Sequence, residues 1–314
     1  MNIHIKTLLN EQFNIGNMDL SGKQKYHNSN IFNKNIDLIE KAQKIYKNIL
    51  KEYYIEKDNI MLLNALTSVI KPTNEQELKK IIVYYSNEYP DESLNWIDVS
   101  EITNMSSLFY NSRYDGDISQ WDVSNVKFMN NMFTNSYFNN DISQWDVSNV
   151  ESMLGMFSRS CFNNDISKWN VSNVKNMSSM FGTSAFNNDI SEWDVHHVTD
   201  MSYMFCNSKF NSDISGWDVS NVNKMYAMFS DSKFNRDISK WDVSNVLDMS
   251  YMFHESRFNQ DISEWDVSRA CDMRGMFSES RFNQDISNWN INASKQNLDE
   301  MFDNCPIKEE YKPV

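Results

Sequence analysis

The chain has little glycine, proline or cysteine and no long apolar run. Its 314 residues include 7 Gly, 4 Pro and 4 Cys. Phosphate-binding loops and tight turns need backbone with positive φ, so an ordinary nucleotide-binding enzyme would use more glycine. So few cysteines give no disulfide framework. Because no apolar run approaches the roughly 18 residues of a membrane span, we expect no membrane insertion.

Motifs for catalysis and for metal binding are also missing. The five histidines, at positions 4, 27, 196, 197 and 254, have no metal-ligand spacing, and no cysteine pair accompanies them. The glycine-rich dinucleotide motif, the phosphate-binding loop and the nucleophile elbow G-x-S-x-G do not occur. Cys305 falls in a repeated serine position, which indicates a small buried side chain. We therefore predict a protein that is not an enzyme and uses no cofactor or metal.

The negative charge is confined to one part of the sequence. Residues 1–95 hold 12 Lys/Arg and 12 Asp/Glu, whereas residues 96–314 hold 17 and 31, which accounts for the whole net charge of -14. An acidic surface repels nucleic acids and anionic membranes, so neither is expected as a partner. The first residues lack the apolar core of a signal peptide, which predicts a cytoplasmic or otherwise intracellular protein. Export without a signal peptide is the alternative.

Tryptophan, methionine and phenylalanine are abundant because of an internal repeat. All nine Trp belong to it: eight follow one another at 24 residues, from Trp121 to Trp289, and Trp96 precedes them by 25. Phe109 to Phe277 and Phe138 to Phe282 form two further columns with the same spacing. The unit reads Asp-Ile-Ser-x-Trp-Asp-Val-Ser-Asn-Val-x-x-Met-x-x-Met-Phe-x-x-Ser-x-Phe-Asn-x. Equal spacing in several columns identifies about eight structural repeats.

Each repeat contains two apolar patterns. Ile118, Trp121 and Val123 include a strand-like alternation of apolar and polar residues, in residue types that favour strands. Val126, Met129, Met132 and Phe133 follow the i, i+3, i+6, i+7 spacing of one helix face. Ser124 or Asn125 would cap that helix. The sequence thus predicts one strand and one helix of about two turns in every repeat.

So short a unit cannot close a core alone, but stacked units can. We therefore predict an α/β solenoid of 24-residue, leucine-rich-like repeats, right-handed, with a parallel β-sheet on one face and short helices on the other. A small helical region would precede it. Asn and Asp would occupy the left-handed turn positions, which explains how the repeats manage with little glycine.

The unit Asp-Ile-Ser-x-Trp-Asp-Val-Ser-Asn-Val-x-x-Met-x-x-Met-Phe resembles the mycoplasma-type repeat of unknown function in the BspA-like (bacterial surface protein) branch of leucine-rich repeats. The resemblance covers about residues 72–305. Ile118, Trp121 and Val123 match the first apolar positions of the leucine-rich pattern, but Val126 stands where that pattern has its Asn. Members with a proposed role act at cell surfaces or on host cells. The resemblance therefore implies a surface or host-interaction protein.

The chain divides into four segments by pattern. Residues 1–33 are Asn-rich and aperiodic, and we expect them to be poorly ordered. Residues 34–92 are predicted to be a helical N-terminal region and cap, with helices over 36–54 and 59–70. A further helix capped by Thr73 or Asn74 would carry Leu78, Ile81, Ile82 and Tyr85. Residues 93–305 form the repeats, and 306–314 are a C-terminal tail.

Two regular columns have both a structural and a functional interpretation. The Trp column could stack sugars or bases, but the alternation Trp-Asp-Val favours a place in the core. The Asp117 column recurs every 24 residues, and its stacked charges would repel one another by ~0.8 kcal/mol per neighbour in water. Backbone N–H donors in each turn could stabilise these carboxylates. The alternative is Ca²⁺ bound between coils.

Outward positions beside the Trp column form a flat, acidic face. Three columns begin at Gln120, Asp122 and Ser124. Docking of a basic protein segment and simple solvation of the face remain alternatives. His196 and His197 interrupt two columns in the middle of the array, and sequence drift and a contact site are the alternative explanations. The predicted protein-binding residues are Asp122, Asp146, Asp194, His196, Asp218, Asp242 and Asp266. We predict a non-enzymatic scaffold for protein–protein interaction, with a surface adhesin or structural spacer as the alternative. The sequence does not indicate an oligomeric state.

Overall fold

The computed structural model describes residues 70–291 and 296–313. The chain divides into two compact units, 1–71 and 72–314. The segment 1–33 and the helices expected over 36–54 and 59–70 lie almost wholly outside the described residues. Everything below concerns the unit 72–314, which contains all the repeats.

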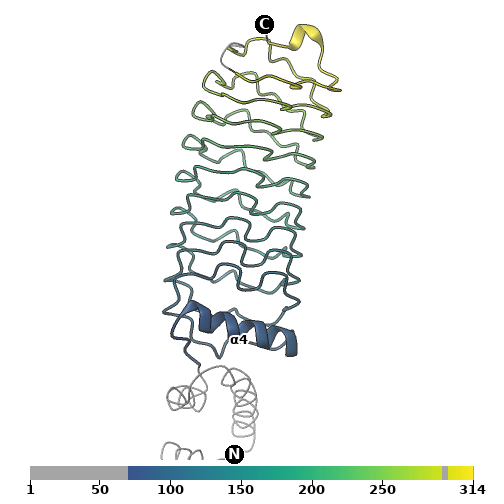
Figure 1. The fold of residues 1–314 in the computed structure, drawn as a ribbon. Helices are drawn as coiled ribbons and strands as arrows, with labels where there is room; N and C mark the ends of the chain where they lie inside the picture. The colour runs from purple at the N-terminus through teal and green to yellow at the C-terminus, as the bar shows by residue number, and fades with distance from the viewer. Residues whose placement is uncertain (1–69, 292–295, 314) are drawn as a thin grey trace, which may run out of the picture. The chain divides into compact units, whose positions relative to one another are not determined.

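Helix α4 (Glu75–Glu88) begins where the sequence indicates. The Asn74 side chain accepts a hydrogen bond from the backbone N–H of Glu77 (3.0 Å), and the backbone N–H of Thr73 donates to the Glu77 carboxylate (2.8 Å). In this way two backbone N–H groups near the start of the helix each have a side-chain acceptor. The helix is 14 residues long and buries Leu78, Ile81, Ile82 and Tyr85, as predicted. It lies against the first coil of the repeats (Figure 1), where Tyr85 contacts Trp96 edge to face.

The repeats wind into coils that stack along one axis (Figure 1). Neighbouring coils pair in parallel, with one isolated β-bridge per coil at a spacing of 24 residues, and 25 at the last step. The bridges pass through Asn104, Phe128, Ser152, Asn176, Asp200, Lys224, Asp248, Asp272 and Asn297. The short 3-10 helix η3 (Glu309–Tyr311) lies in the tail at the C-terminal end.

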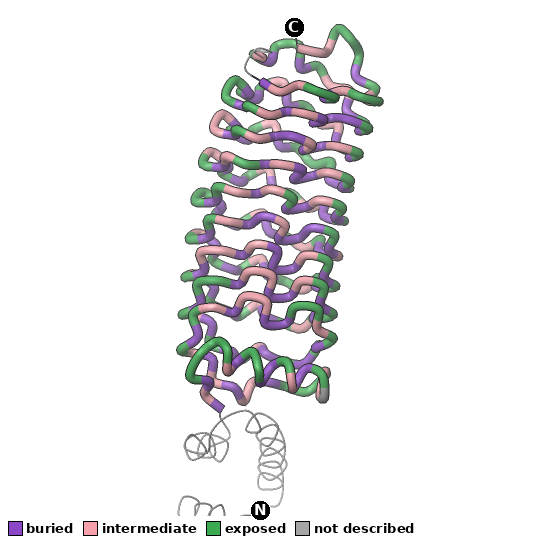
Figure 2. The backbone as a smooth tube through the Cα atoms, in the orientation of Figure 1, coloured by how far each residue is buried: buried purple, intermediate pink, exposed green. Residues whose placement is uncertain are grey.

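Each coil is a closed series of tight turns. In the coil that starts at Ile118, hydrogen bonds from residue i+3 to residue i join Trp121 to Ile118 (3.1 Å) and Val126 to Val123 (2.9 Å). Met132 donates to Met129, and Ser136 to Phe133, both at 3.2 Å. All eight of these side chains are buried. Buried and exposed segments consequently alternate around every coil (Figure 2).

The short helix expected in each repeat does not form. Within the described residues, helix occurs only in α4 and η3. The spacing i, i+3 of Val126, Met129 and Met132 comes instead from successive turns, which also place residues i and i+3 on the same side. The parallel pairing is displaced as well. It runs through the segment that was predicted to be helical, where the backbone N–H groups of Met129 and Phe133 donate to the next coil (3.0 and 2.9 Å).

Two positions per coil have the left-handed backbone conformation. Among the described residues, sixteen other than glycine have φ between 49° and 58°, and Gly155 and Gly275 have φ of 62° and 59°. Only six of the sixteen are Asn or Asp; Thr183 and Tyr203 are among the others. The prediction that Asn and Asp would fill these positions was therefore only partly right. Most of the remaining residues donate a backbone hydrogen bond to the next coil, as Thr183 does to Cys206 (2.7 Å). These bonds offset the cost of the left-handed conformation, which is about 1–2 kcal/mol per residue.

The core is built from ladders of identical side chains. Phe133 stacks on Phe157 with ring centroids 5.6 Å apart, and the Phe138 ring lies 4.5 Å from Phe133 within the same coil. Trp145 stacks on Trp121 at 6.4 Å. Its indole N–H donates to the Ile118 carbonyl of the preceding coil (3.2 Å), which satisfies the buried polar atom. The same contacts recur along the stack, so every coil depends on its two neighbours.

An asparagine ladder joins the coils at the position after the second Phe. The Asn139 side chain accepts from the backbone N–H of Asn163 (2.8 Å), and Asn163 accepts in the same way from Asn187 (2.8 Å). The ladder continues to Asn283, which accepts from Lys308. Side-chain ladders therefore supply inter-coil hydrogen bonds at a position different from that of the standard leucine-rich pattern.

Candidate functional site

The predicted binding residues lie on the outside of the stack. Each predicted Asp is exposed, while the residue before it and the residue after it in the sequence are buried. Each Asp accepts a hydrogen bond from the backbone N–H two residues further on; Asp122 accepts from Ser124 (3.1 Å) and Asp242 from Ser244 (3.0 Å). The Asp122 column comprises Asp122, Asp146, Asp194, Asp218, Asp242 and Asp266. This local hydrogen bond fixes one carboxylate oxygen in each turn.

The same hydrogen bonds favour the ionised carboxylate at three members of the column. The hydroxyl of Ser148 and then its backbone N–H lower the pKa of Asp146, and Ser268 lowers the pKa of Asp266 in the same way. Ser220 lowers the pKa of Asp218, with a smaller contribution from His196. Hydrogen bonds to a carboxylate favour its ionised form. These three positions are therefore anionic at neutral pH.

His196 contacts one member of the column directly. Its Nδ1 lies 2.8 Å from Oδ2 of Asp218 in the next coil, and its backbone N–H donates to Asp194 (3.1 Å). His197 stands where other coils have an Asn and makes the equivalent contact, Nδ1 to the Ser172 carbonyl, at 2.9 Å. His197 therefore keeps the contact of the Asn it replaces, whereas the His196 side chain adds a contact to Asp218 in the next coil and so joins Asp194 to Asp218.

A second acidic column runs parallel to the first. Its members are Asp117, Asp141, Asp165, Asp189, Asp213, Asp237, Asp261 and Asp285, all exposed. The backbone N–H of Ser239 donates to Asp237 (2.8 Å), and this bond, followed by the Ser239 hydroxyl, lowers the carboxyl pKa. Backbone donors thus offset the repulsion, as the structural interpretation predicted. No group of three His, Cys, Asp or Glu residues within 70–291 and 296–313 could hold a metal ion.

The remaining sequence candidates lie in the interior. Trp121 and the seven Trp that follow at 24 residues are 3–4% exposed, so none of these rings is available as a stacking platform. Cys305 occupies the serine column, half-buried beside Ser280, and its thiol donates to the Phe282 carbonyl (3.2 Å). Both observations agree with a packing role.

The array also has a groove that the sequence interpretation missed. It has a volume of about 570 Å³ and crosses five coils, from Arg159 to Arg257. One side carries the basic row, which is the position between the buried Ser and the second Phe in four successive coils: Lys209, Lys233, Arg257 and Arg281. The first three line the groove. Tabulating that column at 24 residues would have shown the run of cations.

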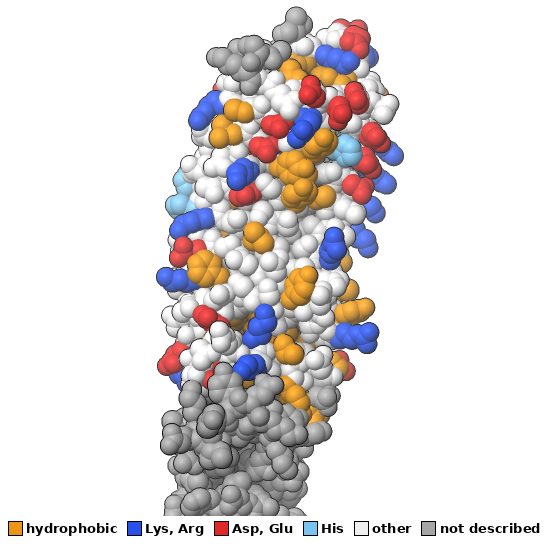
Figure 3. All heavy atoms as spheres, viewed as in Figure 1, with side chains coloured by type: hydrophobic (Ala, Val, Ile, Leu, Met, Phe, Trp, Pro, Cys, Tyr) orange, Lys and Arg blue, Asp and Glu red, His pale blue; other side chains and the backbone are white. Residues whose placement is uncertain are grey.

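Figure 3 shows one face of the molecule, which carries both positive and negative side chains. On this face Lys and Arg side chains alternate with Asp and Glu, and hydrophobic side chains gather in its upper half. The exposed tyrosine Tyr203 packs edge to face against Tyr226 (4.8 Å), and Tyr226 against Tyr251 (6.1 Å). The acidity of the array is therefore not spread evenly over its surface.

The family comparison defines the class of repeat. The model described as "Mycoplasma protein of unknown function, DUF285" matches four overlapping stretches, residues 79–184, 138–233, 158–255 and 207–311. Together they span most of the chain and all of the regular coils. The chain belongs to this mycoplasma repeat family of unknown function. No curated protein and no solved structure matches it.

Among the helices in the described part of the chain, none is long and apolar enough to cross a membrane.

Proposed function

We propose that the repeats form a non-enzymatic scaffold that binds a basic segment of another protein along the Asp122 column. The observation that carries this proposal is the order of the carboxylates. Each is exposed and held in place by its own turn, and the members recur at the same position of the coil along the stack. A partner would meet a preorganised row of charges, so little conformational entropy is lost on binding.

The C-terminal half of the column is the strongest part of this surface. Asp194, Asp218, Asp242 and Asp266 follow one another in consecutive coils, whereas Asn170 interrupts the column earlier. At ~4.8 Å between coils, neighbouring carboxylates repel by ~0.9 kcal/mol in water. Lysine or arginine side chains of a partner would relieve that repulsion, while a neutral partner would not.

We also propose that the stack is a solenoid of the BspA-like superfamily. Parallel pairing at a constant 24-residue spacing and atypical ends, with α4 covering the first coil and η3 in the C-terminal tail, support this classification. The turn-built coil differs from the strand and helix that the leucine-rich pattern suggests. An experimental structure of residues 72–314 with one strand and one helix in each repeat would contradict the geometry on which both proposals rest.

Binding of a fluorescein-labelled oligolysine peptide, followed by fluorescence anisotropy, tests the functional proposal. In the test variant Asp218→Asn, Asp242→Asn and Asp266→Asn are combined. Asn170 shows that Asn keeps the turn, because its Oδ1 accepts from Ser172 at 3.2 Å. Affinity should fall by roughly tenfold or more with loss of three charge pairs, and more still in the reversal variant Asp146→Lys with Asp218→Lys.

The matched control removes three negative charges from the same part of the array. Glu279→Gln, Glu300→Gln and Asp303→Asn lie on exposed positions outside both the Asp122 column and the groove. This variant should bind the peptide almost as well as the parent protein. An equal loss of affinity in both triple variants would mean that only net charge attracts the peptide, and the proposed site would be wrong.

A further inference from the structure

The groove across five coils carries charged side chains that the described fold does not require. Its volume is about 570 Å³, and it spans the left-handed corner of each coil together with the two following positions. Four steps of ~4.8 Å give a length of about 19 Å, which matches about six residues of extended chain. The exposed charged residues vary from coil to coil here, whereas the buried Ser beneath them recurs.

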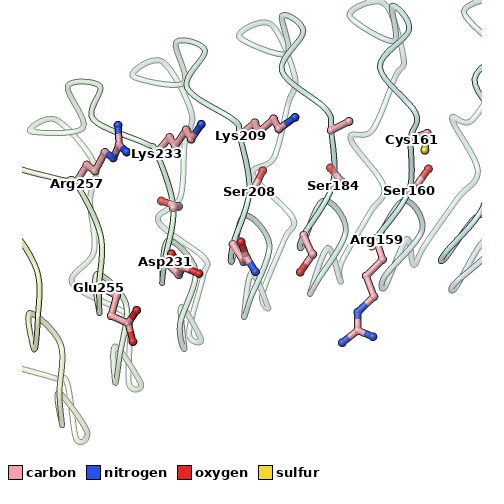
Figure 4. A pocket seen from close by; sticks show the side chains of 14 residues that line it. Arg159, Ser160, Cys161, Ser184, Ser208, Lys209, Asp231, Lys233, Glu255 and Arg257 are labelled. Carbon is pink, nitrogen blue, oxygen red and sulfur yellow. The ribbon is translucent and has the colours of Figure 1, made fainter.

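One side of the groove has a row of cations without partners. Lys209, Lys233 and Arg257 are exposed, and within the described residues their side chains form no ion pair or hydrogen bond. Figure 4 shows the three side chains in line, one per coil, along the same edge. Three cations in line repel one another, and an anionic ligand would relieve that repulsion.

The floor between the two sides consists of serine hydroxyls. Ser160, Ser184 and Ser208 are 3–4% exposed. Each hydroxyl accepts a hydrogen bond from the backbone N–H of the Phe two residues further on (3.0–3.2 Å). None donates its own proton to an acceptor in the described part of the chain. A row of hydroxyl donors beside a row of cations suits a ligand with carboxylate or carbonyl oxygens.

The opposite side is acidic in the same coils. Asp231 and Glu255 line the groove across from Lys233 and Arg257, and Arg159 lies at its N-terminal end (Figure 4). A ligand of uniform negative charge would be repelled along that side. An extended peptide sends successive side chains to opposite sides, so it can present acidic groups to one row and basic groups to the other.

We propose that this groove binds an extended peptide segment of alternating acidic and basic residues. The acidic side chains face Lys209, Lys233 and Arg257, the basic side chains face Asp231 and Glu255, and the peptide backbone lies over the serine hydroxyls. The site is separate from the Asp122 column and selects a different sequence.

The experiment uses a labelled peptide of alternating Asp and Lys, with a peptide of the same composition in two charge blocks for comparison. Anisotropy should show saturable binding of the alternating peptide and at least tenfold weaker binding of the block peptide. Lys209→Glu combined with Lys233→Glu should reduce binding of the alternating peptide by about tenfold or more, since each lost pair weakens a desolvated contact. Circular dichroism confirms that the variant is folded.

Lys168→Glu with Lys240→Glu is the matched control, because both lysines are exposed outside the groove and the change in net charge is the same. This control should bind the alternating peptide like the parent protein. The triple variant at Asp218, Asp242 and Asp266 should also leave it unchanged, which separates this test from that of the proposed function. The inference is overturned if neither peptide saturates, if both bind equally, or if the control loses as much affinity as the groove variant.

Discussion

The Asp columns and the groove are both charged surfaces of the same coils, but their charges have different origins. Each carboxylate of the Asp columns receives a backbone hydrogen bond inside its own turn, as Asp237 does from Ser239 (2.8 Å). The cations Lys209, Lys233 and Arg257 have no such side-chain partner in the residues described. The Asp positions are regular because each turn needs a side-chain acceptor there, whereas nothing in the described fold requires the groove cations.

Columns of identical residues and columns of varying residues therefore indicate different things about the molecule. Where the same residue recurs in successive coils, the fold requires it. Its exposed charge is then also available to a partner. Where the exposed residue changes from coil to coil above a constant interior, the fold does not determine its identity. Such residues can be adapted to a ligand. Substitutions that separate turn formation from charge therefore distinguish the two surfaces.

The largest effect is expected in the interior that both surfaces share. Phe205 is fully buried between Phe181 and Phe229, with ring centroids 5.8 and 5.7 Å away. Phe205→Ala should lower the free energy of unfolding by roughly 3–5 kcal/mol and weaken both peptide interactions. Tyr137→Ala, at a position 61% exposed, should change stability by less than about 0.5 kcal/mol. Urea denaturation measures both, and equal destabilisation would contradict the core ladder.

Lowering the pH should show how much the carboxylates of the Asp117 column together contribute to stability. Backbone and hydroxyl donors lower the pKa of Asp165, Asp189, Asp213 and Asp237 in the folded state. Their contribution is present above the unfolded-state pKa of about 4 and is lost as pH falls through the lower folded-state pKa. Thermal denaturation should show stability decreasing below about pH 4. Replacing all four by Asn should flatten this decrease, and an unchanged profile would contradict it.

Substitutions of a single Asp should separate the contribution of its hydrogen bond to stability from the contribution of its charge. Asp237→Ala removes the acceptor of the Ser239 N–H and should destabilise by about 1 kcal/mol. Asp237→Asn keeps an acceptor of the same shape and should recover most of that loss. Urea denaturation of the pair is the measurement. If Asn destabilises as much as Ala, charge rather than the turn maintains this position.

Much of the fold could be predicted because the repeat is unusually regular. The 24-residue period, the buried Trp, Met and Phe columns and helix α4 all follow from spacing and capping residues. The internal geometry of a coil could not be predicted, because a series of turns places residues i and i+3 inward just as a helix does. Val126, Met129 and Met132 fit both. Hydrogen bonds to residues 23 positions ahead, which decide between them, leave no mark on local sequence.

The candidate surfaces differ in the same way. The Asp122 column is visible in sequence because its members are identical, and the structure places them outside as expected. In each coil the groove uses consecutive residues, namely a left-handed corner, a serine and a variable residue, and only the coil geometry places the triplets of successive coils side by side. The position of Lys209 and Lys233 holds Cys161 and Ala185 in the two preceding coils, so the column does not stand out as a repeat of identical residues and shows only when it is tabulated by charge.

The smallest effect on stability is expected for the groove cations, and this is the sharpest test of the comparison. Lys209→Glu with Lys233→Glu removes no hydrogen bond or ion pair within the described residues, and both side chains are exposed. The free energy of unfolding should therefore change by less than about 0.5 kcal/mol, even though binding of the alternating peptide is lost. Urea denaturation and anisotropy on one preparation measure the two quantities together. A destabilisation as large as that of Asp237→Ala would show that the fold does require these cations, and the distinction between the two surfaces would disappear.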